Sequence, residues 1–370
     1  MKVSRRLIVF ISLFVGMSVS ELESFQGSDP LVNESPVQEK ELHSSIITSE
    51  FIFDNVPFPS AHASTILEAG NILISAWFGG TREGADDVGI WISRQVEGEW
   101  TQPLEVADGL QPDGRKYPCW NPVLFKMLDG TVMLFYKVGP RVGSWLGMLR
   151  TSRDKGLTWS DAERLPEGIV GPTKNKPIQL EDGSIISPSS RGWRIYFERS
   201  IDEGRSWTVA NPPSTFESTD AIQASILIHP GGRLQALGRT RSGRVFETWS
   251  EDEGRSWSEI TLTMLPNPNS GIDAVTLDNG YQLIVYNHSS AGRRSPLNIA
   301  LSYDGVTWEA ALVLESGAGE YSYPAVIQTS DGFVHITYTW RRQRIKHVVI
   351  DPLKLISIPM YTGEWPADIR

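Results

Sequence analysis

The chain lacks several features that mark common protein classes. It has a single cysteine, Cys119, so it forms no internal disulfide and its stability has to come from a buried core. Its 44 Asp and Glu residues outnumber 34 Lys and Arg residues, and the net charge of −10 argues against sequence-independent binding to nucleic acid. No His, Asp and Glu residues share the spacing of metal ligands, so we expect neither a catalytic metal nor a cofactor. A lone structural Ca²⁺ held by loop carboxylates stays open.

Long apolar segments are scarce as well. The one at the N-terminus covers residues 7–17, after three basic residues and before the small residues 18–20. This order is typical of an export signal, and the stretch is short for a transmembrane helix. We therefore predict a signal peptide over 1–20, a flexible polar lead-in over 21–45, and a secreted or periplasmic protein that does not stay in the membrane after cleavage. A retained membrane anchor is the alternative.

What the chain does have is turns and a repeat. Its 33 Gly, 23 Pro and 13 Trp residues favour an all-β chain of short strands. The segments SRDKGLTW, SIDEGRSW, SEDEGRSW and SYDGVTW begin at Ser152, Ser200, Ser250 and Ser302, separated by 48, 50 and 52 residues. A degenerate fifth copy, SRQVEGEW, begins at Ser93. A steady period of this length indicates a repeat architecture.

A second series of turns alternates with the first, and alternating apolar residues flank each one, which is typical of a β-hairpin. These turns fall at 68–70, 129–130, 182–183, 231–232, 279–280 and 331–332. Six hairpins imply six repeats, and about fifty residues holding about four strands make one blade of a propeller. The sequence therefore predicts an all-β fold, a six-bladed β-propeller over residues 46–370.

The Ser-x-Asp-x-Gly-x-Thr-Trp pattern resembles the Asp-box of the sialidase superfamily, over about residues 50 to 350. The resemblance implies a propeller of the sialidase type. In such a box the Asp accepts backbone N–H bonds, the Gly takes a positive φ, and the Trp packs between blades. The box is structural and also occurs in other propellers, so it leaves the function open.

Blade topology sorts the polar residues by face. The Gly turns and Asp-boxes lie on one face, and the starts of the inner strands lie on the other. Counting back from each turn glycine places a polar residue at the start of every inner strand: His62, Asn121, Asn175, Gln223, Asp273 and Tyr323. Loops between second and third strands add polar residues to the same face, among them Arg82, Glu83, Asp86, Asp87, Lys137, Arg239, Arg241, Arg244, His288, Arg294, Trp340 and Arg342. Cations gathered on one face of an acidic protein favour a carboxylate or sulfate ligand.

Sialidases of this fold hold the sugar carboxylate with three arginines and use an Asp acid and a Tyr nucleophile assisted by a Glu. The resemblance implies that Asp87, or the adjacent Asp86, is the acid and that Tyr323 is the nucleophile or proton carrier. The corresponding arginines are Arg241, Arg244 and Arg294. Two positions depart from the pattern, because His62 stands where the first arginine belongs and Gln223 where the Glu belongs.

These departures keep several functions open. A Tyr with an ordinary pKa near ~10 is a poor nucleophile without a neighbouring base. We predict a monomeric, exo-acting sialidase-like glycosidase on an acidic oligosaccharide or polysaccharide, with His62 in place of the missing arginine. The first alternative is a uronate lyase that uses His62 and Tyr323 for proton transfer, with Asn175, Lys176 and His288 nearby. The others are a carbohydrate-binding propeller with Trp120, Tyr321 and Trp340 stacking on sugars, and a scaffold propeller.

Overall fold

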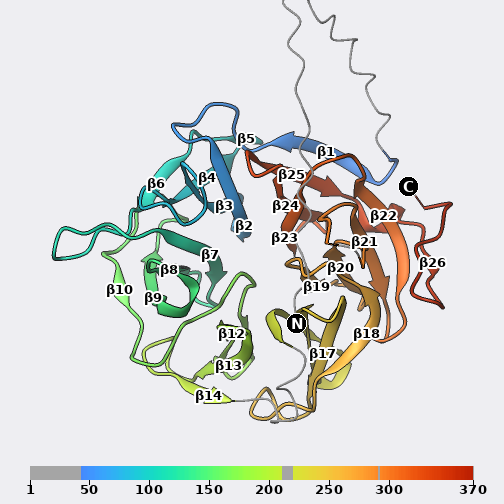
Figure 1. The fold of residues 1–370 in the computed structure, drawn as a ribbon. Coiled ribbons are helices and arrows are strands. Elements are labelled where there is room, and N and C mark those ends of the chain that lie inside the picture. Colours follow the sequence, from blue (N-terminus) through green and yellow to red (C-terminus); the bar gives the residue numbers. More distant parts are fainter. Residues whose placement is uncertain (1–42, 211–219, 291, 370) are drawn as a thin grey trace, which may run out of the picture. The chain divides into compact units, whose positions relative to one another are not determined.

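The computed structural model describes residues 43–210, 220–290 and 292–369. The predicted signal peptide and most of the predicted lead-in lie outside these residues. Within them, six antiparallel sheets are arranged around a common centre (Figure 1). The six-bladed propeller predicted from the repeat is confirmed.

The first three blades follow one another along the chain, each with its first strand at the centre. Blade 1 holds β2 (Ser60–Ala69), β3 (Ile72–Gly80), β4 (Gly89–Val96) and β5 (Glu99–Trp100), with β6 (Leu104–Ala107) also paired to β4. Blade 2 holds β7 (Cys119–Lys126), β8 (Val132–Val138), β9 (Leu146–Ser152) and β10 (Glu163–Arg164). Blade 3 holds β11 (Ile178–Gln179), β12 (Ile185–Arg191), β13 (Arg194–Ser200) and β14 (Thr208–Ala210).

The last three blades repeat the pattern, and two of them recruit a strand from elsewhere. Blade 4 holds β15 (Ala221–Ile228), β16 (Leu234–Thr240), β17 (Arg244–Ser250) and β18 (Thr261–Pro266). Blade 5 holds β19 (Asp273–Thr276), β20 (Gln282–Tyr286), β21 (Leu297–Ser302) and β22 (Glu309–Glu315), followed by β26 (Ile358–Pro359). Blade 6 holds β23 (Tyr321–Gln328), β24 (Val334–Trp340), β25 (Arg344–Ile350) and, outermost, β1 (Ile46–Phe51). Because β1 precedes blade 1 in the chain, its pairing with β25 closes the ring.

Helical turns among the described residues are confined to three short 3-10 segments: η1 (Val142–Ser144), η3 (Pro230–Gly232) and η4 (Pro352–Lys354). No helix within the described part of the chain is long and apolar enough to cross a membrane.

The Asp-boxes form the turns between third and fourth strands. In blade 2 the Oδ1 atom of Asp154 accepts hydrogen bonds from the backbone N–H groups of Leu157 (3.1 Å) and Thr158 (2.9 Å). The box glycine, Gly156, has a φ of +74°. The three later boxes repeat this arrangement around Asp202, Asp252 and Asp304. The structural role predicted for the box is confirmed.

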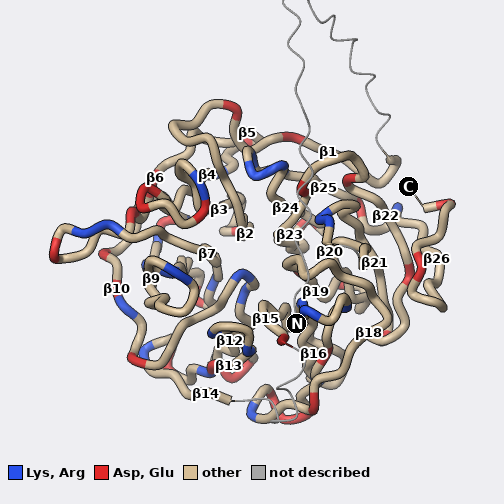
Figure 2. The backbone as a smooth tube through the Cα atoms, in the orientation of Figure 1, with Lys and Arg blue, Asp and Glu red and all other residues tan. Residues whose placement is uncertain are grey.

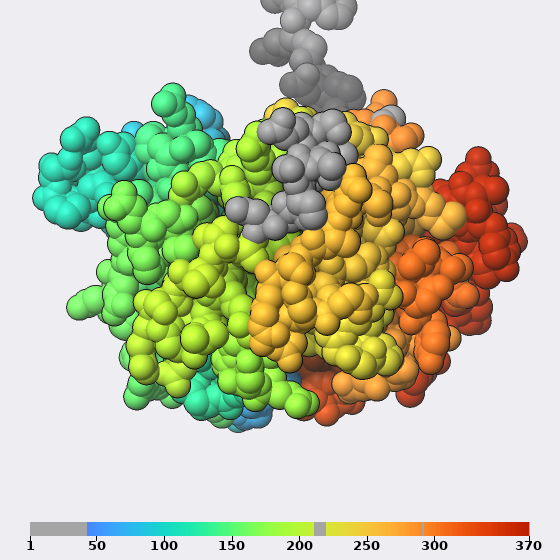
Figure 3. All heavy atoms as spheres, turned by 90° about the horizontal axis from the view of Figure 1, so that it is seen from below, coloured from blue at the N-terminus to red at the C-terminus, as the bar shows by residue number. Residues whose placement is uncertain are grey.

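The box tryptophans pack each blade on the preceding one. Trp257 of blade 4 stacks on Phe197 of blade 3, with ring centroids 3.7 Å apart. Trp308 of blade 5 is fully buried in a cluster with Leu237 of blade 4. In the edge-on view the green, yellow and orange blades accordingly lie side by side (Figure 3). This packing fixes the blades relative to one another, so their inner ends form one rigid surround for the centre.

Candidate active site

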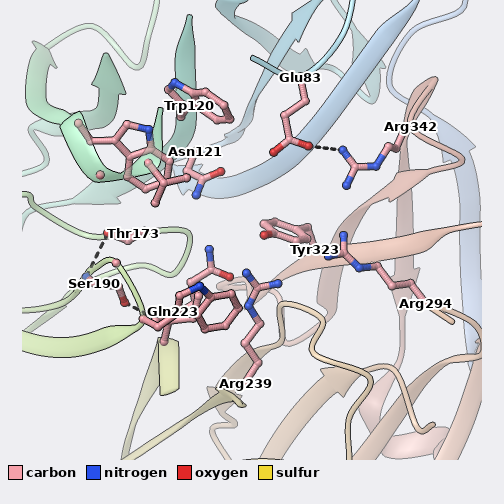
Figure 4. A pocket seen from close by; sticks show the side chains of 16 residues that line it. Glu83, Trp120, Asn121, Thr173, Ser190, Gln223, Arg239, Arg294, Tyr323 and Arg342 are labelled. Atoms are coloured by element: carbon pink, nitrogen blue, oxygen red, sulfur yellow. Dashed lines mark hydrogen bonds and ion pairs between the residues drawn. The ribbon is translucent and has the colours of Figure 1, made fainter. Parts of the chain in front are cut away.

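A pocket of about 430 Å³ lies at the centre of the ring and receives residues from all six blades (Figure 4). We call it the central pocket. Its polar and charged lining residues are Glu83, Asn121, Thr173, Ser190, Gln223, Arg239, Arg294, Tyr323 and Arg342, and its aromatic lining residues besides Tyr323 are Trp120, Trp145 and Trp193. The loops between second and third strands contribute to this lining, on the face opposite the Asp-boxes.

Bulges at the starts of the inner strands direct side chains into the central pocket. Asn121, Gln223 and Tyr323 have φ values of +38°, +58° and +52°, and Ala63 has +55° at the corresponding place in blade 1. At each of these positions the pairing with the second strand shifts register. A bulge of this kind re-aims a side chain at the end of a strand. Asn121, Gln223 and Tyr323 therefore face the pocket, as the sequence predicted of their position.

Three predicted positions are wrong, and they lie in the two blades whose first strands pair without such a bulge. Asn175, Asp273 and Lys176 do not line the central pocket; they belong to a buried network between inner strands. The Asp273 carboxylate accepts bonds from Ser225 Oγ (2.6 Å), Val326 N (2.8 Å) and Lys176 Nζ (2.9 Å). The same count back from the turn glycine reaches the bulge in blades 2, 4 and 6, but in blades 3 and 5 it reaches a position outside the pocket lining. In blade 3 the residue that lines the pocket is Thr173 instead.

His62 lies behind Tyr323, outside the lining of the pocket. It is 1% exposed, its Nδ1 is 2.9 Å from Thr339 Oγ1, and its ring centroid is 4.3 Å from that of Tyr323. Burial lowers the pKa of His62 well below its usual value, and the neighbouring cations, Arg342 first, lower it further. His62 is therefore neutral, and the expectation that it replaces an arginine as a cation is wrong.

Two arginines from different blades lie over the Tyr323 ring, and a third lines the same pocket (Figure 4). The guanidinium carbons of Arg239 and Arg294 lie 5.5 Å and 5.4 Å from the centroid of the Tyr323 ring. Arg239 is 7% exposed and donates from Nη1 to the carbonyl of Asn269 (3.1 Å). Arg342 lines the pocket from blade 6. The pocket thus holds a cationic set from blades 4, 5 and 6, of which only Arg294 was assigned a role from the sequence.

Glu320 holds two of these arginines in place. Its Oε1 accepts from Arg294 Nη1 and its Oε2 from Arg342 Nε, both at 2.9 Å, and Ser322 Oγ donates to Oε1 at 2.7 Å. Burial by itself raises the pKa of Glu320, but the bonds from Arg342 and Ser322 and the charge of Arg294 lower it overall. An ionised Glu320 fixes Arg294 and Arg342 with their remaining N–H groups available to the pocket.

The loop after β3 contributes Glu83 to the pocket rather than Asp87. Asp87 Oδ2 accepts bonds from the N–H (2.9 Å) and the Oγ1 hydroxyl (2.5 Å) of Thr81, within its own loop. These bonds lower the pKa of Asp87, which disfavours its use as a proton donor. Asp86 and Arg82 are exposed and do not line the pocket. Glu83 is the one carboxylate among the described residues that line it.

Lys137, predicted to bind substrate, is completely buried instead. Its Nζ donates to the carbonyl of Pro172 (2.7 Å), and burial lowers its pKa to about 7. Its long side chain supports the segment leading to Thr173 and does not reach the pocket lining. The predicted contact with substrate is wrong.

Four further residues lie outside the pocket, contrary to expectation. Arg241 pairs with Asp220 at 3.1 Å and covers the outer side of Trp193, with its guanidinium carbon 3.8 Å from that ring. The other three contact residues outside the pocket lining. Arg244 donates to the carbonyls of Thr263 and Met264, His288 contacts Tyr286 and Trp365, and Trp340 packs on Phe51. Burial lowers the pKa of His288 to about 4, so it too is neutral.

The aromatic lining gathers on the side of blades 2 and 3. Trp120 donates from Nε1 to the carbonyl of Gly139 (2.8 Å), and its ring centroid is 5.7 Å from that of Trp145. Trp193 and Ser190, both from blade 3, line the adjacent part of the pocket. Blades 2 and 3 thus line the pocket with aromatic rings beside the polar side chains of Asn121, Thr173 and Ser190, and blades 4, 5 and 6 line it with arginines. An amphipathic ring with one charged substituent fits this division.

Comparisons with known proteins agree with the fold. The family model described as a BNR repeat-like domain matches residues 71–336. An anhydrosialidase from Macrobdella decora is 26% identical over an alignment of 258 residues, covering 58% of this chain and 33% of that protein. The chain thus matches about a third of the length of this relative.

Solved structures resemble the propeller at low identity. The intramolecular trans-sialidase from Ruminococcus gnavus gives a TM-score of 0.68 at 14% identity, covering 85% of this chain and 99% of that one. The NanB sialidase from Streptococcus pneumoniae also gives 0.68, at 11% identity, covering 83% and 71%. The family model matches well over half of the chain, so the protein belongs to the BNR repeat-like domain family, within the sialidase superfamily.

The described residues include no group of three or more His, Cys, Asp or Glu side chains that could hold a metal ion. The buried Cys119 carries no redox partner, because it is the single cysteine of the chain.

Proposed function

We propose that this protein cleaves the glycosidic bond of a sugar that carries a carboxylate, as a sialidase-like glycoside hydrolase. The observation that carries the proposal is that Arg239, Arg294 and Arg342 line one pocket with Tyr323, with Arg239 and Arg294 lying over the Tyr323 ring. Guanidinium groups pair with planar carboxylates through two parallel hydrogen bonds, and partial burial strengthens them. The names of the relatives, anhydrosialidase and trans-sialidase, support a sialic acid as the first substrate to test.

In this proposal each group of the pocket has a role. The three arginines hold the carboxylate, and the tryptophans of blades 2 and 3 cover the apolar face of the sugar ring. Tyr323, at the centre, gives its hydroxyl proton to solvent and forms a bond to the anomeric carbon as the glycosidic C–O bond breaks. When water attacks that carbon, the bond to Tyr323 breaks and the phenolate takes a proton back from solvent. Glu83 gives its proton to the departing oxygen and takes one back from the water that releases the sugar.

A uronate lyase is the second candidate, and one observation favours it. Gln223 stands where sialidases of this fold place the Glu that assists the tyrosine, and no carboxylate among the described residues hydrogen-bonds to the Tyr323 hydroxyl. A lyase needs a tyrosine that removes the proton beside the carboxylate while arginines stabilise the charge that develops there. The buried, neutral His62 contributes no cation to that step.

The two candidates are separated by their products. The purified protein is incubated with sialosides and with uronate-rich polysaccharides, and free sugar and the absorbance of an unsaturated product are recorded. Release of a saturated acidic sugar supports the hydrolase, and an unsaturated uronate supports the lyase. The variants Arg239→Ala and Arg294→Ala should lose activity, whereas Arg205→Ala, on the Asp-box face, should keep it. Silence on every acidic glycan would contradict both candidates.

Export is a separate proposal. The basic start, the apolar stretch and the small residues at 18–20 support cleavage after residue 20 and a secreted or periplasmic enzyme. Mass spectrometry of protein recovered outside the cytoplasm should give a chain that begins near residue 21. An intact N-terminus held in the membrane fraction would contradict it.

A further inference from the structure

Arg342 is held by two carboxylates of different character. Glu320 accepts from its Nε at 2.9 Å, and Glu83 accepts from its Nη1 in a contact drawn in Figure 4. Glu320 belongs to the segment before β23, and Glu83 belongs to the loop after β3. Arg342 therefore sits between blade 6, which carries it, and a carboxylate that reaches over from blade 1.

The Glu320 side is a fixed attachment. The Glu320 side chain is 27% exposed and also binds Arg294 and Ser322, so it could leave Arg342 only by breaking three interactions. The contact between Glu83 and Arg342 can be replaced by a contact with another carboxylate. Glu83 is 41% exposed, it lines the pocket, and among the described residues its one hydrogen-bond partner is Arg342.

We propose that Glu83 is a stand-in for the substrate carboxylate, and that substrate binding exchanges the two. This inference rests on the proposed function. In the free protein Glu83 neutralises the Nη1 side of Arg342. An incoming sugar carboxylate takes this position and releases Glu83 into the pocket beside a second negative charge. A like charge nearby disfavours the ionised form of a carboxyl group, so the released Glu83 takes up a proton from solvent. The substrate thereby prepares the acid that protonates its own leaving oxygen.

The charged groups around Glu83 set the balance of this exchange. From its own loop they are Arg82, Asp86 and Asp87; from the other blades they are Arg239, Arg294, Glu320 and Arg342. Three of the surrounding cations are also the groups that the ligand carboxylate engages. In the complex the ligand carboxylate neutralises much of this positive charge. The arginines then stabilise a negative charge on Glu83 less than they do in the free protein.

The exchange predicts that ligand binding takes up a proton through Glu83. Calorimetric titrations of the wild-type protein with N-acetylneuraminic acid and with D-glucuronate, near pH 6.5, are run in two buffers of different ionisation enthalpy. We expect uptake of up to about one proton per ligand bound. The Glu83→Gln variant should take up none and should bind the acid roughly 3- to 30-fold more tightly, because an uncharged side chain competes weakly for Arg342.

Controls separate this inference from the proposed function. Asp113→Asn removes a carboxylate from an exposed Asp–Arg pair outside the pocket and should behave as the wild type. If the acids bind but Glu83→Gln shows unchanged or weaker affinity and the same proton uptake, the exchange is wrong while the carboxylate site stands. If no acidic sugar binds the wild type or Glu83→Gln, the proposed function fails and the exchange fails with it.

Discussion

At the scale of single residues, the site depends on backbone conformations that residues other than glycine rarely adopt. Asn121, Gln223 and Tyr323 all have positive φ values, and such a conformation costs roughly 1–2 kcal/mol per residue. Strain of this kind, repeated at one mouth, is typical of a site in which side-chain direction matters.

Removing the Tyr323 hydroxyl tests its chemical role. Tyr323→Phe keeps the ring that packs against His62 but removes the oxygen that bonds to carbon or carries the proton. We expect turnover to fall by about 10²–10⁴-fold with thermal stability nearly unchanged. Tyr303→Phe, a 68% exposed tyrosine in an Asp-box turn, is the matched control. Full activity of the Tyr323 variant on an acidic glycoside would show that the hydroxyl takes no part.

The acid is tested by comparing two residues of one loop. Glu83→Gln should lower turnover by about 10²–10⁴-fold, because Glu83 lines the pocket and supplies the proton. Asp87→Asn should lower it less, since the bonds from Thr81 keep Asp87 ionised at neutral pH and tie it to its own loop. Initial rates on the same glycoside decide between them. A larger loss for Asp87→Asn would restore the assignment made from the sequence.

The sequence predicts the pocket residues at the starts of inner strands better than it predicts the arginines around them. Tyr323, Asn121 and Gln223 follow from strand alternation and the turn glycines, because the bulge falls at the same step in their blades. Arg239 lies at the end of β16 and Arg342 in the turn after β24. Both segments are cationic in the sequence, yet nothing in the sequence distinguishes these two arginines from Arg241 and Arg244. Whether an arginine reaches the pocket depends on the direction in which its side chain points at the end of the strand. That direction follows from the folded structure and has no signal in the sequence.

At the scale of elements, the Asp-box turns work because their glycines meet the adjacent blade. A Cβ on Gly254 would lie 2.6 Å from Ile186 Cδ1 of blade 3, and Gly254 has a φ of +76°. Gly231 has a similar φ of +82° in open space. The two positions share the backbone cost and differ in the clash.

Alanine at these two glycines therefore separates conformation from packing. We expect Gly231→Ala to lower the free energy of unfolding by about 1 kcal/mol. Gly254→Ala should lower it by roughly 2–4 kcal/mol, since overpacking adds to the backbone term. Urea denaturation measures both. Equal losses would mean that the turn does not press against blade 3.

The closing strand is joined to its blade by a buried chain of side chains. His335 Nδ1 lies 3.0 Å from His347 Nε2, and His347 Nδ1 lies 3.0 Å from Glu50 Oε1 on β1. Burial, and then the nearby His347, lower the pKa of His335 to about 4. The unfolded chain binds that proton near pH ~6.5, the ordinary value for histidine.

Stability should therefore fall as the pH is lowered from about 6.5 to 4, because the unfolded state takes up the proton first. Each such histidine contributes up to about 1.4 kcal/mol per pH unit to the slope. His335→Gln should make the decline shallower by up to that amount, while its stability at pH 8 serves as the reference. Denaturant unfolding at several pH values tests this. An unchanged slope would mean that His335 is already protonated in the folded protein or stays unprotonated in both states.

At the scale of the whole molecule, the repeat was sufficient to predict the architecture. The boxes at Ser152, Ser200, Ser250 and Ser302 and the alternating Gly turns set blade number and face, because each blade is built by local hairpins. The pairing of β1 with β25 and the addition of β26 to blade 5 were not predicted, since such non-local pairings leave no periodic signal. The ring that they complete holds the central pocket.

The charges of the molecule are mixed at its edge. The protein carries a net charge of −10, and both acidic and basic segments lie on the outer loops, with basic segments also nearer the centre of the ring beside β12 and β20 (Figure 2). A local cationic centre in an acidic protein requires close contact with an anionic group, because the field of the whole chain repels it at a distance. This favours recognition of one carboxylate at the end of a glycan.

The most direct measurement is the affinity of the protein for an acidic sugar compared with its methyl ester. We predict that N-acetylneuraminic acid or D-glucuronate binds at least about tenfold more tightly than its ester, and that Arg239→Ala and Arg294→Ala each reduce this preference. Equal affinity for acid and ester, or a preference that survives in both variants, would contradict a carboxylate site at Tyr323.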